Sequence, residues 1–209
     1  AFFRTDGARY TRMNFFSAKA YLEQNGTLVT WYWRCNHTEP PLRIYRNYVF
    51  PPHKRFYIAF YRIENPSESS HTIDVMEMLH VANYARNAIN ASYDEDLKGI
   101  IVDGRAGGVC CFAFIPCADF ADYQVANDSE TRTWVQTCSP WFLFNELGYL
   151  LNNSEVEAVD VSVAFRYSLQ VPPRGSITFA SLRIIAPSMD DLKAWADIAL
   201  SKSPDEWAS

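Results

Sequence analysis

Two groups of side chains in this sequence have the types that chemistry on sugars requires. The first is the run Pro52-His53-Lys54-Arg55-Phe56-Tyr57, which brings a histidine, two basic residues and a tyrosine together. A polysaccharide lyase removes the proton beside a uronate with a Tyr or His base, while a basic residue neutralises the carboxylate. Because neighbouring residues of a strand point to opposite faces, the run supplies suitable groups without placing them on one face.

The second group is aromatic. Trp31 and Trp33 share one face of an expected strand while Tyr32 takes the other, and Tyr57 and Tyr61 also share a face. Aromatic rings on an open sheet can stack on sugar rings or contact another domain, whereas rings on the covered face pack in the core. We predict these as ligand contacts: Trp31, Trp33, Tyr57 and Tyr61.

The sequence holds no GxSxG, HExxH, P-loop or zinc-deaminase pattern, and no CxxC or nearby His pair that fits a zinc site. A glycosidase needs two carboxylates about 5 to 9 Å apart in a cleft, whereas the acidic residues here cluster in turns. Glu77 interrupts the apolar face of its strand, which predicts a salt bridge with a residue such as Arg62. We expect no catalytic centre, no metal and no cofactor in this chain.

A sheet must position these side chains, and the period-two alternation of residues 157–171 predicts a long strand with one solvated face. The turn at 172–175 ends this strand, and 177–185 returns antiparallel to it. A second hairpin is predicted from 55–64 through 65–70 to 72–82. Further strands are predicted at 28–34, 42–50, 99–102 and 109–115.

Helix is sparse in this pattern. Ser188-Met-Asp-Asp191 resembles a capping box that opens a C-terminal helix ending near Ser201. About eight strands joined by polar turns predict an all-β fold. We expect an antiparallel two-sheet sandwich, of jelly-roll or super-sandwich type, with a C-terminal helix. The β-sandwich domain is placed at 1–187, and the helix and tail at 188–209.

Composition excludes several classes of protein. Of the 209 residues, 48% are hydrophobic and 21% are charged, which excludes intrinsic disorder. No apolar run approaches the roughly 18 residues of a membrane span. The net charge of −5 argues against nucleic-acid binding, because that function needs a basic surface.

The sequence also carries signals of a secretory route. Its N-x-S/T sequons are more numerous than chance predicts, and they begin at Asn25, Asn36, Asn90, Asn127 and Asn152. Ala1 fits the residue left after a signal peptide is removed, so we expect a secreted protein, extracellular or in the lumen of the secretory pathway. An odd number of cysteines predicts one or two disulfides, with at least one thiol that is free or pairs between chains. The candidates are Cys35, Cys110, Cys111, Cys117 and Cys138.

Two sequence strings resemble elements of large sandwich domains in carbohydrate-active enzymes. Phe60-Tyr-Arg-Ile-Glu-Asn65-Pro, followed by Thr72-Ile-Asp-Val, is similar to their "Y-x-I-x-N-x-S/T" element, and residues 165–179 resemble their closing hairpin with its "P-G-S" turn. The chain thus resembles the N-terminal super-sandwich domain of glucoamylase-like and glycoside-phosphorylase enzymes. In those families linker helices and an (α/α)6 barrel follow, and 189–207 looks like the start of that linker. Since their acid and base lie mainly in the barrel, the resemblance implies a non-catalytic domain or a sandwich that has become independent.

We therefore expect a secreted, N-glycosylated β-sandwich protein that acts by binding carbohydrate or a partner chain. One alternative is a small jelly-roll polysaccharide lyase or hydrolase that uses the His53–Tyr57 region. Another is a structural or surface-coat protein that self-assembles, which would make a homo-oligomer the partner. Nucleic acid and a membrane span are not expected.

Overall fold

The computed structural model describes residues 2–5, 15–23, 26–34, 42–82, 88–104, 110–127 and 140–208, and it describes the backbone alone for 2, 5, 15–23, 26–34 and 82. The strands in these ranges are β1 (Phe2–Thr5), β2 (Phe15–Glu23), β3 (Gly26–Arg34), β4 (Arg43–Phe50), β5 (Phe56–Glu64), β6 (His71–Ala82), β7 (Ile89–Asp94), β8 (Gly99–Asp103), β9 (Cys111–Pro116), β10 (Asp122–Asn127), β11 (Glu155–Ala158), β12 (Asp160–Val171) and β13 (Ser176–Ala186). The helices are α1 (Pro140–Phe142), the π-helix η2 (Leu143–Leu147), α2 (Met189–Leu200) and α3 (Pro204–Ala208).

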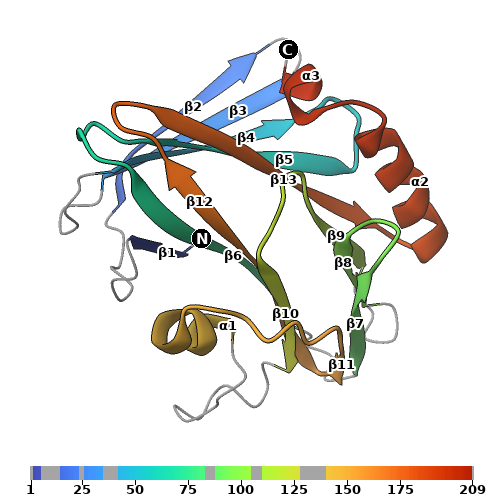
Figure 1. Cartoon of the computed structure of the whole chain (residues 1–209). Coiled ribbons are helices and arrows are strands. Elements are labelled where there is room, and N and C mark those ends of the chain that lie inside the picture. Colours follow the sequence, from blue (N-terminus) through green and yellow to red (C-terminus); the bar gives the residue numbers. More distant parts are fainter. Residues whose placement is uncertain are drawn as a thin grey trace.

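The strands form two antiparallel sheets that pack face to face (Figure 1). The small sheet has the order β1-β6-β12-β10, and the large sheet has the order β11-β7-β8-β9-β13-β5-β4-β3-β2. Between them lies an aromatic core in which Phe165 meets Phe114 edge-on, with ring centroids 4.8 Å apart, and Tyr167 packs on Phe179 at 4.7 Å. The predicted antiparallel two-sheet sandwich with a C-terminal helix is confirmed.

The alternation expected for residues 157–171 is present, but it covers two strands rather than one. The inward positions Val161, Val163, Phe165, Tyr167 and Val171 are fully buried in β12. β11 instead pairs with β7 in the large sheet, and β12 begins only at Asp160 in the small sheet. The chain therefore crosses between the sheets near Val159, a step that alternation cannot reveal because both sheets bury the same kind of side chain.

Helices cover the outer faces of both sheets. Leu192, Ala196 and Ala199 of α2 belong to one core cluster with Leu182 of β13 and Ile58 of β5, outside the large sheet. Ser188 caps α2, since its Oγ accepts a hydrogen bond from the Asp191 N–H at 3.1 Å, as the capping box predicted. No helix in the described ranges has both the length and the apolar character needed to cross a membrane.

The outer face of the small sheet is covered in a similar way. Leu143 and Phe144 of η2 are buried with Met76 of β6 and Ala164 of β12. The described layers are therefore α1 with η2, the small sheet, the large sheet, and α2 with α3 (Figure 1). Since β5 and β13 lie between the small sheet and α2, aromatic residues on either face of these two strands can be buried.

Asn65 joins the two hairpins that carry the strings resembling super-sandwich domains. Its side chain is 1% exposed, and its Nδ2 donates to the carbonyl oxygens of Ser69 at 2.7 Å and Pro172 at 3.1 Å. Its Oδ1 accepts from the Ser67 N–H at 2.9 Å, and its backbone N–H donates to the Gly175 carbonyl at 2.9 Å. Asn65 thus supplies several of the hydrogen bonds between the β5–β6 and β12–β13 turns, which the Arg174 N–H also joins by donating to the Ser67 carbonyl at 2.9 Å.

Candidate functional site

A buried carboxylate lies in the middle of the space between the sheets. Glu77 of β6 is 1% exposed, and its Oε1 accepts from Arg183 Nη2 of β13 at 3.0 Å and from the Tyr61 hydroxyl of β5 at 2.6 Å. The Tyr167 hydroxyl lies 3.4 Å from Oε2. The predicted pairing of Glu77 with Arg62 is wrong. Arg62 lies on the opposite face of β5, where its Nη2 is 2.8 Å from Glu64 Oε1.

Glu77 holds the sheets together as a charged group. Burial raises the pKa of its carboxyl, but the positive charges of Arg183 and Arg46 and the hydrogen bond from Tyr61 outweigh that effect, so the pKa lies below its usual value. Burial, together with the Glu77 charge, raises the pKa of Tyr61 and Tyr167 well above the ordinary value, so both donate as neutral hydroxyls. A carboxylate enclosed and engaged in this way suits a structural role better than proton exchange with a ligand.

Arg46 of β4 stands at the edge of this buried network. Its guanidinium carbon lies over the rings of Tyr48 and Tyr61, 4.6 and 5.1 Å from their centroids, and its Nη2 is 3.8 Å from Glu77 Oε1. Its side chain is 20% exposed, yet its Nε is buried and has no hydrogen-bond partner among the described residues. Two guanidinium groups, Arg46 and Arg183, therefore share one carboxylate.

Three aromatic rings extend the site beyond Arg46 to the surface, and we call Tyr48, Phe50 and Tyr57 the aromatic face. Phe50 is 41% exposed and stacks on Tyr57 with centroids 5.2 Å apart and an interplanar angle of 27°. The ring centroid of Tyr48 lies 5.9 Å from that of Tyr57 and 6.3 Å from that of Phe50. The register of β4 against β5 places these positions and Arg46 on one face of the large sheet.

The predicted contacts meet this site in different ways. Tyr57 is part of the aromatic face, whereas Tyr61 requires a correction, because its 1% exposed side chain belongs to the core beneath the site. In the register of β3 against β4, Trp31 pairs with Arg46 and Trp33 pairs with Ile44. The positions of both tryptophans thus belong to the same sheet face, and their side chains lie outside the described part of the chain.

The run containing His53 does not form a site with Tyr57. His53 is exposed in the turn between β4 and β5, with φ at 57°. Lys54 Nζ lies 5.9 Å from the Trp195 ring centroid and 5.7 Å from that of Trp207, on the helix-covered side of the large sheet. Lys54 and Tyr57 therefore lie on opposite faces of the large sheet.

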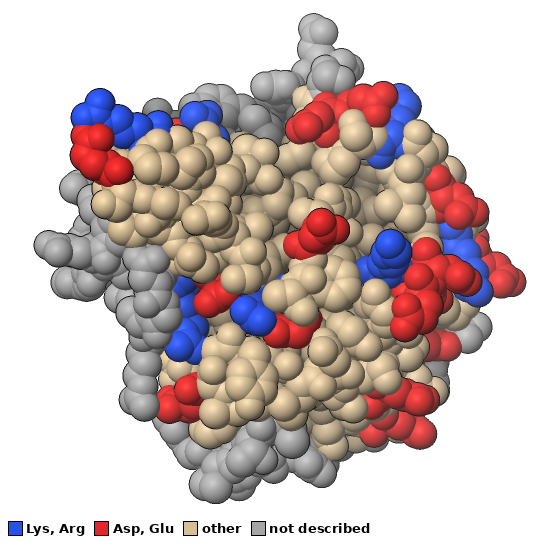
Figure 2. Space-filling model, in the orientation of Figure 1, with Lys and Arg blue, Asp and Glu red and all other residues tan. Residues whose placement is uncertain are grey.

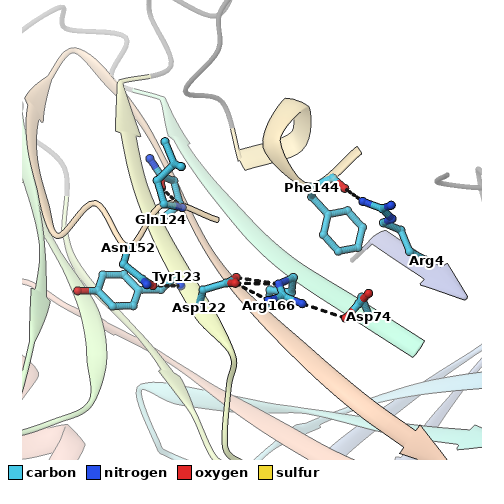
Figure 3. Close-up of polar contacts among 9 residues, drawn as sticks. Arg4, Asp74, Asp122, Tyr123, Gln124, Phe144, Asn152 and Arg166 are labelled. Carbon is cyan, nitrogen blue, oxygen red and sulfur yellow. Dashed lines mark hydrogen bonds and ion pairs between the residues drawn. The ribbon is translucent and has the colours of Figure 1, made fainter. Parts of the chain in front are cut away.

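A second polar cluster lies on the outer face of the small sheet (Figure 3). Arg166 Nε donates to Asp122 at 2.9 and 3.0 Å, Nη2 also pairs with Asp122, and Nη1 donates to Asp74 at 3.0 Å. Nearby, Arg4 Nη1 donates to the Phe144 carbonyl at 2.8 Å. In Figure 2 a short row of alternating basic and acidic atoms crosses this face. Because Arg166 is matched by two carboxylates, we assign this cluster to fixing the sheet and η2.

The modification and disulfide candidates are only partly described. Asn90 and Asn152 are exposed and Asn127 is half-buried, while Asn25 and Asn36 lie outside the described residues. Cys110 is exposed, Cys117 is half-buried, and the buried Cys111 thiol lies 3.6 Å from Asp103 Oδ1. No disulfide joins these three cysteines to one another, so the expected disulfides are not found there. Cys35 and Cys138 lie outside the described ranges.

Reasoning from sequence identified Glu77 and Tyr57 but missed Arg46, Arg183 and the rings of Tyr48 and Phe50. A signal was available for Arg183, since it is the one charged residue of β13, and Glu77 is the one charged residue on the apolar inward face of β6. Matching these two interruptions would have suggested the pair.

No family model matches this chain, and no curated protein matches it in sequence. Among solved structures, the chain is similar to a bacterial glucoamylase in complex with acarbose, with 7% identity and a TM-score of 0.67 over 99% of this chain and 29% of that one. It is also similar to a protein assigned as a kojibiose phosphorylase, from the human microbiome, with 11% identity and a TM-score of 0.58 over 100% of this chain and 25% of that one.

A protein assigned as an aldose 1-epimerase, from Klebsiella pneumoniae, has 8% identity and a TM-score of 0.52 over 90% of this chain and 58% of that one. This chain thus spans less than a third of the glucoamylase and of the phosphorylase. At these identities the likeness concerns the fold. The resemblance to super-sandwich domains of carbohydrate-active enzymes is confirmed at that level.

Proposed function

We propose that this chain is a non-catalytic carbohydrate-binding module whose ligand stacks on the aromatic face. The observation that carries the proposal is the stack of the exposed Phe50 on the half-buried Tyr57, on the sheet face that also carries Arg46. Stacking on aromatic rings suits sugars, because one face of a pyranose ring presents apolar C–H groups while its edge presents hydroxyls. The structural neighbours, which are proteins of carbohydrate metabolism, support the same class of ligand.

Affinity for polysaccharides tests this function directly. We would immobilise a panel of neutral and acidic polysaccharides and measure retention of the chain and of Phe50→Ala and Tyr57→Ala variants. Each variant is expected to lose about tenfold in affinity, corresponding to roughly one stacking interaction. Trp141→Ala is the matched control, because Trp141 is 40% exposed on α1, far from the aromatic face in the fold. Equal retention of all four proteins would contradict the proposal.

Secretion and N-glycosylation belong to the proposal as well. Asn90 and Asn152 are exposed and therefore accessible as acceptors. Enzymatic deglycosylation of protein from its source converts each modified Asn to Asp, which peptide mass spectrometry detects. Unmodified peptides at every sequon would exclude this part.

Docking to a partner chain is a second candidate, favoured by a different surface. Four large apolar residues in α1, in η2 and just after η2 are 40 to 49% exposed: Trp141, Leu147, Tyr149 and Leu151. Such a concentration is typical of a contact surface. Native mass spectrometry of the chain from its source, compared with a Trp141→Ser/Leu151→Ser variant, tests it. A larger partner lost in the variant supports docking, a self-complex lost in the variant supports self-assembly, and an unchanged monomer excludes both.

A further inference from the structure

We infer that Arg46 recognises an anionic substituent, a carboxylate or a sulfate, on the saccharide that the aromatic face binds. This inference rests on the proposed carbohydrate-binding function and adds the class of sugar. It follows from the charge, the hydrogen bonding and the position of one side chain.

The charges around Arg46 do not cancel. Glu77 is the acidic residue that meets it, at 3.8 Å, and the same oxygen accepts the closer Arg183 at 3.0 Å and the Tyr61 hydroxyl at 2.6 Å. Glu64 belongs to the opposite face of β5, where it pairs with Arg62. The described groups around Glu77 thus carry one positive charge in excess, and that charge lies at Arg46, the more exposed of the two arginines.

The donors of Arg46 also lack acceptors. A guanidinium has five N–H donors, and leaving buried donors unmatched costs free energy. Among the described residues no hydrogen bond from Arg46 is found, and its Nε is both buried and without a partner. Arg183, by contrast, donates to Glu77 and to Ser181 Oγ at 2.9 Å. Arg46 therefore contacts the rings of Tyr48 and Tyr61 and the Glu77 carboxylate, while no acceptor among the described residues takes a hydrogen bond from its guanidinium.

The geometry suits a charged group attached to a stacked sugar. The Arg46 guanidinium lies over Tyr48, and Tyr48 lies 5.9 Å from Tyr57, which stacks with Phe50. A pyranose ring on the Phe50–Tyr57 platform would thus place a substituent near the guanidinium, which binds carboxylate and sulfate oxygens with paired hydrogen bonds. The chemical class is an acidic saccharide, bearing uronate or sulfate groups.

Matched polysaccharide pairs test the inference. Alginate, polygalacturonate and hyaluronan would each be compared with their carboxyl-reduced forms, and heparin with its desulfated form, by affinity electrophoresis with the full chain. The variants are Arg46→Gln, Arg46→Lys and, as control, Arg62→Gln on the opposite sheet face. Urea unfolding of each variant confirms that its fold is retained.

We expect at least one acidic polymer to bind about tenfold or more tightly than its neutral counterpart, as a charge-assisted hydrogen bond implies. Arg46→Gln should remove this preference while leaving binding to the neutral form, Arg46→Lys should keep part of it, and Arg62→Gln should change nothing. The comparisons with the carboxyl-reduced and the desulfated polymers show whether Arg46 recognises a carboxylate or a sulfate. Equal binding of acidic and neutral forms would overturn the inference and leave the proposed function standing, whereas no binding to any polymer would overturn both.

Discussion

The Nη2 atom of Arg183 on β13 lies 3.0 Å from the Oε1 atom of Glu77 on β6, so one buried ion pair spans the two sheets. The residues are 106 positions apart in the chain, and both side chains are almost fully enclosed. The Glu77 carboxylate also accepts hydrogen bonds from two tyrosine hydroxyls, that of Tyr61 in the large sheet and that of Tyr167 in the small sheet. This contact therefore fixes the relative position of the sheets under the aromatic face.

Removing the charge of Glu77 should destabilise the fold strongly. Glu77→Gln leaves Arg183 buried without a counter-ion, and the free energy of unfolding is expected to fall by about 3–5 kcal/mol. Urea unfolding measures the loss, with Glu64→Gln as control. That substitution breaks the more exposed pair with Arg62 and should cost less than about 1 kcal/mol. Similar effects of the two substitutions would contradict a special role for Glu77.

The Glu77 carboxyl should also make the free energy of unfolding depend on pH in the acidic range. Because its pKa is lower in the folded protein than in the unfolded chain, its stabilisation is fully present above the unfolded value of about 4.3 and is lost as the pH falls through the folded value. The difference in unfolding free energy between the wild type and Glu77→Gln should therefore narrow below about pH 4. A difference that stays constant from neutral to acidic pH would show that Glu77 is not the group responsible.

Loss of the Asn65 side chain should weaken the connection between the two hairpin turns. Asn65→Ala removes the hydrogen bonds to Ser69, Pro172 and Ser67 and leaves enclosed backbone groups unmatched, at an expected cost of about 2–3 kcal/mol in unfolding free energy. Glu68→Gln in the same turn is the control, because its pair with Arg174 is exposed and should contribute almost nothing. Equal unfolding midpoints for Asn65→Ala and the wild type would refute the proposed link.

The described cysteines should differ in reactivity. Burial raises the pKa of the Cys117 thiol to about 11, so at about pH 8 only about one molecule in a thousand carries the reactive thiolate there. Cys110 is exposed. Limited alkylation with iodoacetamide, read by peptide fragmentation, should label Cys110 well before Cys117, and unfolding in urea should remove the difference. Faster labelling of Cys117 in the folded protein would contradict its burial.

Alternation along the chain was enough to predict most central strands, because each buries one regular set of side chains. β10 escaped prediction because Asp122 and Gln124, which look like loop residues, are buried on its outer side. Asp122 is enclosed there through Arg166, a partner 44 residues away. Such a strand becomes recognisable only after its neighbours are known.

The candidate site was predictable in part for a similar reason. Periodicity placed Tyr57 and Tyr61 on one face, but it could not show that the small sheet encloses Tyr61 while Tyr57 remains only half-buried. The partner of Glu77 was likewise assigned to Arg62, whose position in β5 has the wrong parity to reach the core. The burial of Tyr61 and the partner of Glu77 both depend on pairing between strands that are distant in the chain, and local sequence carries no information about that pairing.

The pairing of β6 with β12 also constrains when the protein can fold. Glu77 and Tyr167, which meet in the core, are 90 residues apart, and β5 likewise pairs with the late strand β13. Since a chain is synthesised from its N-terminus, β5 and β6 leave the ribosome long before β13 and β12, which pair with them, have been made. A topology so rich in distant pairings folds slowly. The Glu77–Arg183 pair beneath the aromatic face can therefore form only once β13 has emerged, and until then the core side chains of β5 and β6 are exposed to chaperones and to other nascent chains.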